Sequence, residues 1–572
     1  MADENKDRTP SASASGGSDP AGMALALGGA SRAEADGFLR KQGVLSDKQS
    51  ALADEQIALT RLQADDLRRE DRLRHWSLRI RHISDLMKVA FEFSVAAILL
   101  VLAGLVAAAV WSAAHDHSVV IEAFSVPPDL AAKGLTGEVV ASKMLARLSA
   151  MQAQTGSSRA ASSYASNWDG NIKLQIPDTG ISIAEADRFL HAWLGHQTAI
   201  VGEVYRTSTG IAVTARAGGA STPIVTGHED DVDQLVDRVA ASVYRTTQPY
   251  RYAIYLITAD LGPDGLPAPE QDREAREILE QLTHTGTPED RAWAYDGLAA
   301  DYRNHGDLYS ALPFIRKSVE LSPGLDNQTD QSGIEFLLQH DESHLKILSA
   351  AVSLAGRGGE TDMDPDAAEA VEISDRRAMA LATGDTQAVL ALGRKLHSLP
   401  DATDLIFPYA DDLVACATEH DAPCVLNFWQ EDKMPLSFLQ GADFLLGHFR
   451  DAAARLPAIQ SGTRNPIGRA EEARLVLARQ AVIEANLGNT KVAHDLIDKT
   501  PLDCTPCLRF RGQIDSLEKN WGGAAYWFER AIEDTPDTPF GFADWGAMLL
   551  AKGALDGAIA KFILANRKGS HF

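Results

Sequence analysis

The sequence predicts a mainly α-helical protein with a single apolar helix long enough to cross a membrane, a small α/β domain and a long stack of paired helices. Three observations lead to this prediction. Residues 93–114 form an unbroken apolar run, residues 119–246 mix short apolar stretches with amphipathic helical patterns, and residues 250–572 repeat small and aromatic residues at a spacing of 34. A chain of 572 residues is long enough to bury more than one core.

The net charge lies almost entirely in the second part of the chain. The formal net charge is −25, and residues 1–92 contribute −1 of it because they hold 14 Lys and Arg against 15 Asp and Glu. Residues 93–572 therefore carry −24 (−25 minus −1). Phosphate binding requires clustered Lys and Arg, so we expect no nucleic-acid partner.

The N-terminal part predicts a tail followed by a helix. Residues 1–40 are rich in Ser, Ala and Gly, which predicts disorder. A helix is expected over residues 45–92, with Ser46 and Gln49 in a capping box. Apolar side chains recur along it at heptad spacing: Leu45, Leu52, Leu59, Leu73, Ile80 and Met87. Since Asp66 interrupts this seam, the pattern fits either a self-associating helix or an amphipathic helix lying on an anionic membrane surface.

Residues 93–114 contain no ionisable side chain. A hydrocarbon layer of about 30 Å needs roughly 20 helical residues, so the run predicts a transmembrane helix rather than the alternative, a buried core helix. Arg74, Arg79, Arg81 and Lys88 precede the run, and the next basic residue is Lys133. Positive charge stays in the cytoplasm, which places residues 1–92 inside and residues 115–572 on the far side of the membrane.

Residues 119–246 predict a domain with the element order βαβαβββα. Residues 119–126 form an apolar strand halted by Pro127 and Pro128, and residues 171–176 form a second strand. A helix follows from Ser182 to Leu194, then a hairpin that turns at Gly210. A short strand near Ile224 precedes a final helix with an apolar face: Val232, Leu235, Val236, Val239 and Val243.

Short motifs in this domain resemble the amino-terminal domain of the TolB type. They are Phe124 to Pro128, Gly134-Leu135-Thr136 followed by Glu138-Val139-Val140, and Gly202-Glu203-Val204 leading into VTAR. The resemblance implies a binding and assembly module without catalytic residues. Bacteria often join such domains to tetratricopeptide arrays in membrane-anchored or adenylate-cyclase-linked proteins, which implies that the membrane is a bacterial inner membrane and the far side its periplasm.

Three units of residues 250–572 resemble tetratricopeptide repeats, in which two antiparallel helices cross at small residues and stack on the next pair. The signature residues of the first unit are Tyr295, Leu298, Ala299, Tyr302, Ala311 and Pro323. Those of the second are Gly512, Ala524, Phe528, Ala531 and Pro536. Those of the third are Trp545, Gly546, Ala558, Phe562 and Ala565. Residues 375–399 and 471–497 keep a weaker form of the pattern, and residues 357–366 predict a loop. We expect the last unit either to be followed by further repeats, which we favour, or to dock on a partner.

The four cysteines are Cys416, Cys424, Cys504 and Cys507, and they allow three disulfide pairings. We favour the local pairs in an oxidising compartment, with free thiols, a zinc site or redox activity of the Cys504–Cys507 motif as alternatives.

Catalytic, cofactor and metal motifs are weak throughout. His115-Asp116-His117 fits an exit loop, and His191 and His196 lack the Glu of a zinc-protease helix. Ser516 and Lys519 lack the companion motifs of a serine acylase. Asp362, Asp364 and Asp366 lack the Gly and terminal Glu of a calcium loop. We predict no catalytic residue, no cofactor and no metal.

These patterns predict a non-enzymatic scaffold of the inner membrane that binds proteins or peptides through a periplasmic helical array, in envelope or secretion assembly. The alternative is a signalling protein that relays periplasmic binding to a cytoplasmic partner such as a cyclase or transcription regulator. Pull-down with residues 1–92 separates the two.

Overall fold

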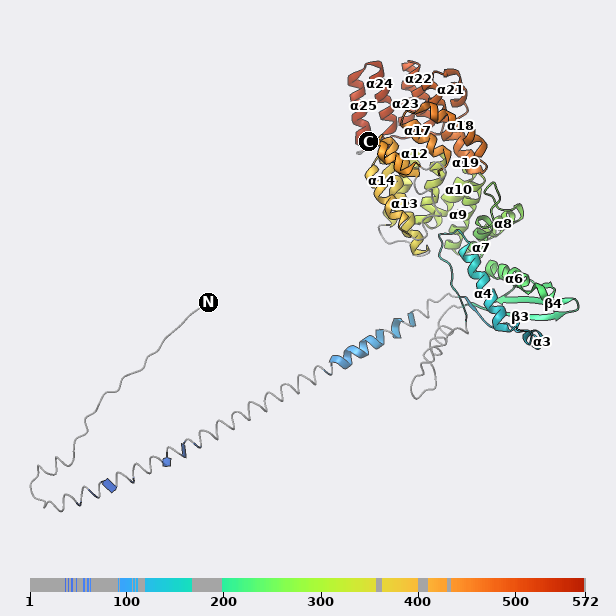
Figure 1. Ribbon diagram of the computed structural model, residues 1–572, viewed down its shortest axis with the longest axis vertical. Coiled ribbons are helices and arrows are strands. Elements are labelled where there is room, and N and C mark those ends of the chain that lie inside the picture. The colour runs from blue at the N-terminus through green and yellow to red at the C-terminus, as the bar shows by residue number, and fades with distance from the viewer. Residues whose placement is uncertain are drawn as a thin grey trace, which may run out of the picture. The chain divides into compact units, whose positions relative to one another are not determined.

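The computed structural model describes residues 119–166, 198–355, 363–399, 410–429 and 434–569, and scattered residues between 37 and 111 (Figure 1). The chain divides into two units, Met1–Ala109 and Val110–Phe572. Several predictions lie outside the described residues: the strand at 171–176, the helix at 182–194, the His115–His117 motif and most of the loop at 357–366.

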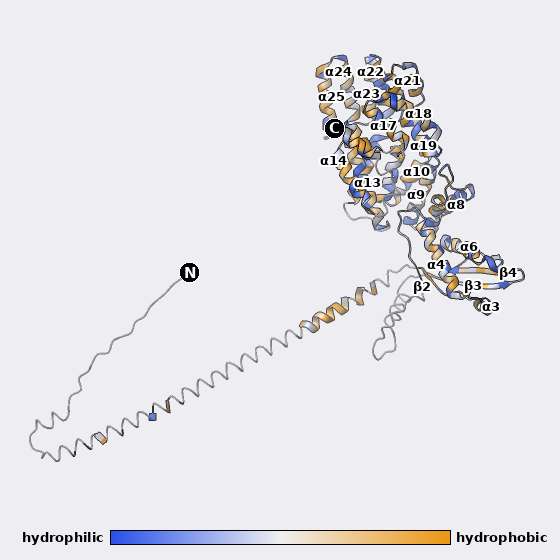
Figure 2. Cartoon of the chain, in the orientation of Figure 1, coloured by the Kyte–Doolittle hydropathy of each residue, from blue (hydrophilic) through white to orange (hydrophobic). Residues whose placement is uncertain are grey.

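In the first unit, residues 93–104 and 106–108 are helical, and their large apolar side chains, among them Phe93, Ile98 and Leu100, are exposed. Figure 2 shows this segment as mostly hydrophobic. Within the residues that the structure describes, we find no helix with both the length and the apolar character needed to span a bilayer. The transmembrane prediction for residues 93–114 therefore stays a prediction.

The second unit begins with a small mixed sheet. Its strands are β1 (Val119–Ile121), β2 (Tyr164–Ser166), β3 (Thr198–Thr207), β4 (Gly210–Ala217), β5 (Ala220–Ser221) and β6 (Val225–Gly227). The strand order is β2-β1-β3-β4-β5, with β6 also paired to β4. β1 runs parallel to β2 and β3, whereas β3 and β4 form an antiparallel hairpin that closes at Thr207 and Gly210. The predicted hairpin is confirmed.

Two features of the sheet differ from the prediction. β1 ends at Ile121 rather than at residue 126, because the amide of Phe124 turns away to the carbonyl of Gly137 (3.1 Å). β2 was not predicted, since its three residues, Tyr164 to Ser166, are too few and too polar to carry a strand pattern. Helices α3 (Pro128–Ala131), α4 (Gly137–Ala153) and α6 (Val232–Thr247) complete the layer, and α4 and α6 pack on the sheet.

One apolar core runs from this sheet into the first helices of the array. It joins Ile121 and Val213 of the sheet, Leu148 and Val239 of α4 and α6, and Trp293 farther along the chain. Tyr244 of α6 packs against Tyr252 and Tyr255 of the next helix. The sheet is therefore continuous with the helical array through its side chains.

The rest of the second unit is helical (Figure 1). Its first helices are α7 (Pro249–Thr258), α8 (Pro269–Thr285), α9 (Pro288–Asn304), α10 (Leu308–Leu321), α11 (Leu325–Leu338), α12 (Asp341–Ala355), α13 (Pro365–Thr383) and α14 (Thr386–His397). They are followed by α15 (Ala410–Thr418), α16 (Ala422–Phe428), α17 (Leu436–Leu445), α18 (Phe449–Gly462) and α19 (Pro466–Glu471). A π-helical turn (Glu472–Val476) leads into α20 (Leu477–Asn486), α21 (Thr490–Ile497), α22 (Thr505–Leu517), α23 (Trp521–Asp534), α24 (Phe540–Lys552) and α25 (Leu555–Lys568).

Most of these helices form hairpins with the same kind of turn. In the described part of the array, eight helix pairs from α9–α10 to α24–α25 are joined through one left-handed residue. These residues are Gly306, Gln339, Gly384, His420, Gly447, Gly488, Lys519 and Gly553, with φ from 54° to 86°. A left-handed residue ends a helix and reverses the chain, which glycine does without steric cost. The array thus holds more helical pairs than the three clear units that the sequence predicts.

The array also folds back on itself. Helix α19 and the turn after it contact α9, α11 and α22. Ala470 packs into the core formed by Ala299, Ala311 and Ile315. The amide of Thr505 donates to the carbonyl of Gln339 (3.0 Å), although the two residues are far apart in sequence. Segments of the array that lie far apart in the sequence therefore meet, residues 299–339 on one side and residues 470–505 on the other.

Candidate functional site

The repeated packing of α22–α25 depends on close approach of a ring to a glycine. A Cβ atom added to Gly512 would lie 2.5 Å from Cε1 of Phe528, and one added to Gly546 would lie 2.8 Å from Cε1 of Phe562. Only glycine lets the ring of the second helix reach the backbone of the first. The alanines that follow on the second helices are all buried: Ala524, Ala531, Ala558 and Ala565. Both pairs thus use one geometry.

The first predicted unit is α9–α10. Leu298, Ala299 and Ala311 are buried between the helices. The rings of Tyr295 and Tyr302 lie 6.4 and 5.2 Å from the ring of Phe314. Two further signature residues follow helix ends: Pro323 comes after α10 and Pro536 after α23. A third, Trp545, packs against Lys561, whose ammonium lies 3.3 Å from the ring centroid. The signature residues therefore act in packing and in helix ends.

A polar network fills the place where distant parts of the array meet. Tyr309 donates a hydrogen bond to Asp503, and Arg474 donates to the hydroxyl of Tyr309 (3.0 Å) while its guanidinium lies 5.2 Å from the ring centroid. His340 lies 3.7 Å from Asp503 and 2.6 Å from Glu335. No sequence motif predicts this network, because its members lie in segments far apart along the chain.

The charges in this network support one another. The hydrogen bond to Glu335 raises the pKa of His340, more than burial lowers it. Burial opposes ionisation of Asp503, but the hydrogen bond from Tyr309 and the charges of Arg474 and His340 outweigh burial and lower its pKa. A protonated His340 between two carboxylates stabilises the junction.

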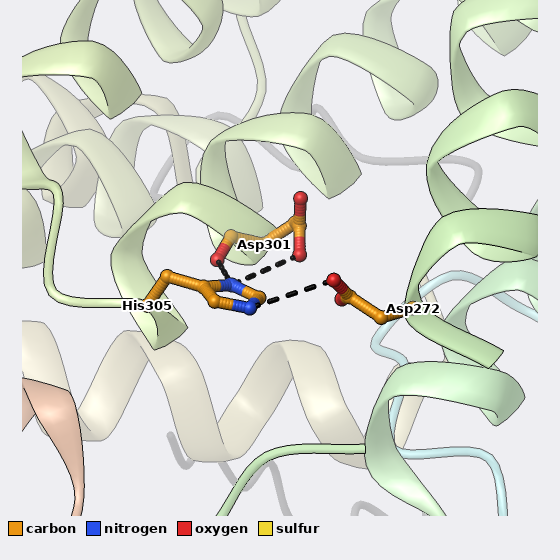
Figure 3. Close-up of side chains that lie close together, drawn as sticks. All are labelled: Asp272, Asp301 and His305. Atoms are coloured by element: carbon orange, nitrogen blue, oxygen red, sulfur yellow. Dashed lines mark hydrogen bonds and ion pairs between the residues drawn. The ribbon is translucent and has the colours of Figure 1, made fainter. Parts of the chain in front are cut away.

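Asp272, Asp301 and His305 point toward one another at the start of the array (Figure 3). His305 Nδ1 lies 2.9 Å from the carbonyl oxygen of Asp301, and Nε2 lies 3.5 Å from a carboxylate oxygen of Asp272. Burial, followed by the charge of Asp272, raises the pKa of Asp301 to about 6. Arg276 lies 2.7 Å from Asp301 and balances its charge. A hollow of about 440 Å³ beside the cluster is lined by Asp272, His305 and the loop at 260–269.

This cluster and two others bring metal-ligating atoms within 4.8 Å of one another among the described residues. The second contains Asp443, His448 and Asp451, and the third contains Asp296, Asp326 and Asp330. Asp296 is buried and its Oδ1 atom has no hydrogen-bond partner, and burial raises its pKa well above the usual range. Arg276, Arg455 and Arg303 each form an ion pair inside one cluster, so each cluster already holds a cation. In each cluster the arginine offsets part of the negative charge of the carboxylates.

The cysteines are paired locally. Cys416 bonds Cys424 and Cys504 bonds Cys507, with Cα atoms 5.5 and 5.2 Å apart. Cys504 and Cys507 are fully buried at the start of α22. A redox Cys-x-x-C motif needs an exposed attacking sulfur, so this disulfide has the environment of a structural one. The pairs also leave no cysteine for a zinc site.

The other candidate motifs have structural places. Lys519 is the left-handed residue of the α22–α23 turn, and its amide donates to the carbonyl of Ser516 (3.0 Å). The Asp364 carboxylate accepts from the amide of Ala367 at the start of α13 (3.4 Å). Both contacts belong to helix ends, and Asp362, His191 and His196 lie outside the described residues.

Comparisons with known proteins give little beyond this architecture. No protein-family model matches the chain, and no curated protein matches it. Among solved structures it is similar to yeast Tom70, with 16% identity over 56% of this chain and 58% of that chain, and a TM-score of 0.22. The match thus spans less than two thirds of Tom70. A TM-score this low assigns no fold, so the class rests on the packing described above: a mainly helical array of tetratricopeptide-like pairs beside a small sheet.

Proposed function

We propose that this protein is a non-enzymatic scaffold that binds proteins or peptides through its helical array. The supporting observation is the repeated packing of α22–α25, in which small and aromatic residues pack between the helices. Side chains on the outer surface of the helices then remain available to contact a partner. Tyr526 and Phe336 are large side chains that are about half exposed, at 52% and 51%. Exposed aromatic residues on rigid helices are common anchors in protein interfaces.

The same proposal places the array in the periplasm, anchored through residues 93–114 to a bacterial inner membrane, where it assembles an envelope or secretion complex. It rests on the uncharged run, on the basic residues before it and on the two disulfides, which suit an oxidising compartment. The helix of residues 45–92 leads into the membrane and could associate with itself or relay a signal.

Protease added to intact spheroplasts tests the compartment. We expect digestion of the array without lysis, because residues 115–572 would face outward. Protection of the array in spheroplasts with digestion after lysis contradicts the periplasmic assignment.

Photo-crosslinking in cells tests the binding role. A photo-reactive amino acid replaces Tyr526, and a matched control replaces Leu261, which is similarly exposed (48%) but lies in the loop before α8. We expect a crosslinked protein at Tyr526 and none at Leu261. Equal yields at both positions, or none at Tyr526 and Phe336, contradict a binding surface on the repeats.

A further inference from the structure

Helix α25 presents an uncovered apolar face. Leu555, Ile559, Phe562 and Ile563 are 60%, 57%, 39% and 49% exposed. With about 100° of rotation per residue, these four side chains fall within roughly one third of the helix circumference. Ala558 and Ala565 lie next to this face and are buried against α24, and the ring of Phe562, at the edge of the face, also reaches Gly546 of α24. Four large apolar side chains on one side of a helix form a patch that proteins normally cover.

The preceding unit shows what covers such a face. Phe528 occupies in α23 the position that Phe562 occupies in α25, yet it is only 1% exposed. The difference is α24, which packs on α23 and places Met548 beside Phe528. The face on α25 therefore has the shape that a helix covers elsewhere in this same array.

Two unpaired charges border this face. Asp556 and Arg567 are exposed, and neither forms an ion pair with another described residue. They lie about three helical turns apart on one side of α25. The neighbouring cations are engaged, since Lys568 pairs with Asp537 (2.7 Å) and Lys561 lies over Trp545. The face thus carries a negative charge near its start and a positive charge near its end.

This order of charges is complementary to that of a second α25 helix running in the opposite direction. In an antiparallel pair of α25 helices, Asp556 of each lies opposite the partner's Arg567, and the twofold axis passes midway between Lys561 and Phe562. The apolar side chains then face one another across the axis. A parallel pair would not bring Asp556 of one copy next to Arg567 of the other.

We propose that α25 packs against α25 of a second copy in an antiparallel, twofold-symmetric contact. The occupant of the apolar face is a second copy of this chain, so that the scaffold acts as a dimer. The contact does not depend on where the array lies in the cell or on what it binds. Because a single helix pair buries less than a standard interface, we expect a dissociation constant in the micromolar range.

Sedimentation of the purified full-length chain tests the contact. Each substitution occurs twice in a twofold interface, so Ile559→Glu should raise the dimer dissociation constant about tenfold or more. Leu261→Glu is the matched control, since it adds the same charge at a similarly exposed leucine outside the face, and we expect no change. A full-length chain that is monomeric at about tens of micromolar, or a dimer that Ile559→Glu leaves unchanged, overturns the proposal.

Charge exchange tests the antiparallel order. Asp556→Arg and Arg567→Asp should each weaken the dimer several-fold at low salt, and the double variant should restore it. Failure of the double variant to restore the dimer overturns the antiparallel arrangement.

Site-specific crosslinking distinguishes this contact from association through residues 45–92. The four native cysteines are all in disulfides, so Phe562→Cys adds the only free thiol. We expect a disulfide between two copies on mild oxidation, and none for Glu529→Cys, an exposed control on α23 one residue after the counterpart of Phe562. A dimer without this crosslink shows that another segment mediates it. A monomer in which Ile559→Cys resists thiol reagents shows that the chain covers the face itself, and either result overturns the proposal.

Discussion

Helices α22–α25 and helices α9–α13 belong to the same array but bury different chemistry. Between α22 and α25 the buried side chains are mainly small or aromatic, and Arg511 is the one buried charge among the described residues there, held by backbone carbonyls 2.7 to 3.2 Å away. Between α9 and α13 the buried side chains include charged residues: Asp296, Asp301, Glu335, Glu342, Asp375 and Arg377.

Contacts with distant segments account for part of this difference, at Glu335 and Glu342. Helices α22–α25 pack mainly on their neighbours in sequence, which the repeat spacing satisfies with apolar contacts. Helices α9–α12 also meet segments that come back from residues 466–537, and ion pairs there fix which surfaces meet. Local stacking is thus specified by apolar size, and the long-range junction by charge.

Replacing each of the two repeat phenylalanines by alanine tests the apolar region first. We expect Phe528→Ala to lower the free energy of unfolding of α22–α24 by about 3–5 kcal/mol, because it leaves a cavity at a fully buried site. Phe562→Ala is the control in the same register and should cost about 1 kcal/mol, since its ring is already 39% exposed. Hydrogen exchange resolves the two regions. Equal losses of stability in the two variants would show that the ring of Phe528 is no better buried than the ring of Phe562.

Asp375 tests the polar region next. Burial raises its pKa to about 7, against the hydrogen bond that Thr329 donates (2.7 Å). The folded form holds this proton more tightly than the unfolded form, so the stability it contributes is present below about pH 4 and is lost as the pH rises through 7. Asp375→Asn should therefore stabilise α11–α13 by about 2–4 kcal/mol at pH 8 and leave them unchanged at pH 4.

The control on the same helix is Glu372→Gln, whose carboxylate pairs with Arg376 at the surface (2.7 Å). Denaturation at several pH values should show a flatter pH dependence for Asp375→Asn and not for Glu372→Gln. An unchanged slope for Asp375→Asn contradicts the buried proton.

Glycine substitutions sharpen the comparison at smaller cost. Gly512→Ala forces a methyl group against Phe528 and should lower the stability of α22–α23 by about 1–3 kcal/mol. Gly333 lies inside α11 with no atom within 4 Å of an added Cβ, so Gly333→Ala should raise stability by up to about 1 kcal/mol. Thermal unfolding with opposite shifts is the expected result, and a stabilising Gly512→Ala would refute the close ring contact.

His340 gives the smallest effect. The raised pKa means that the protonated ring contributes stability below about pH 6.5, and this contribution is lost as the pH rises through the higher folded pKa. We expect the junction to weaken by about 1 kcal/mol toward pH 8. The amide of Thr505 donates to the carbonyl of Gln339 at this junction, so its hydrogen exchange should become faster as the junction weakens. Exchange rates are corrected for the intrinsic effect of pH, and the amide of Ala524 serves as the reference. The dependence should vanish in His340→Gln; if it remains, another group titrates.

Much of the helical architecture is readable in the sequence, and the reasons for the failures are physical. Turns with glycine at the left-handed position, such as Gly306, Gly384 and Gly553, stand out because glycine is favoured there. Turns at Gln339 and His420 carry no such sign, so the pairs they join were missed, whereas the pair joined at Lys519 was found from the spacing of Gly512 and Phe528 instead. The junction of Tyr309, Arg474 and Asp503 is invisible because it depends on how the array curves, which no local pattern encodes. The sequence also does not reveal that Phe562 is exposed, because Phe562 occupies the same repeat position as the buried Phe528.

The hydrogen bond between Gln339 and Thr505 has a mechanical consequence. An open stack of helix pairs stretches like a coil spring, because each pair rotates slightly on the next. Here the hydrogen bond between Gln339 and Thr505 joins the two ends of the segment 339–505. Tension applied across the array therefore acts on this contact before the helix pairs of that segment can separate. The array should resist extension at low force and lengthen abruptly once the contact between Gln339 and Thr505 breaks.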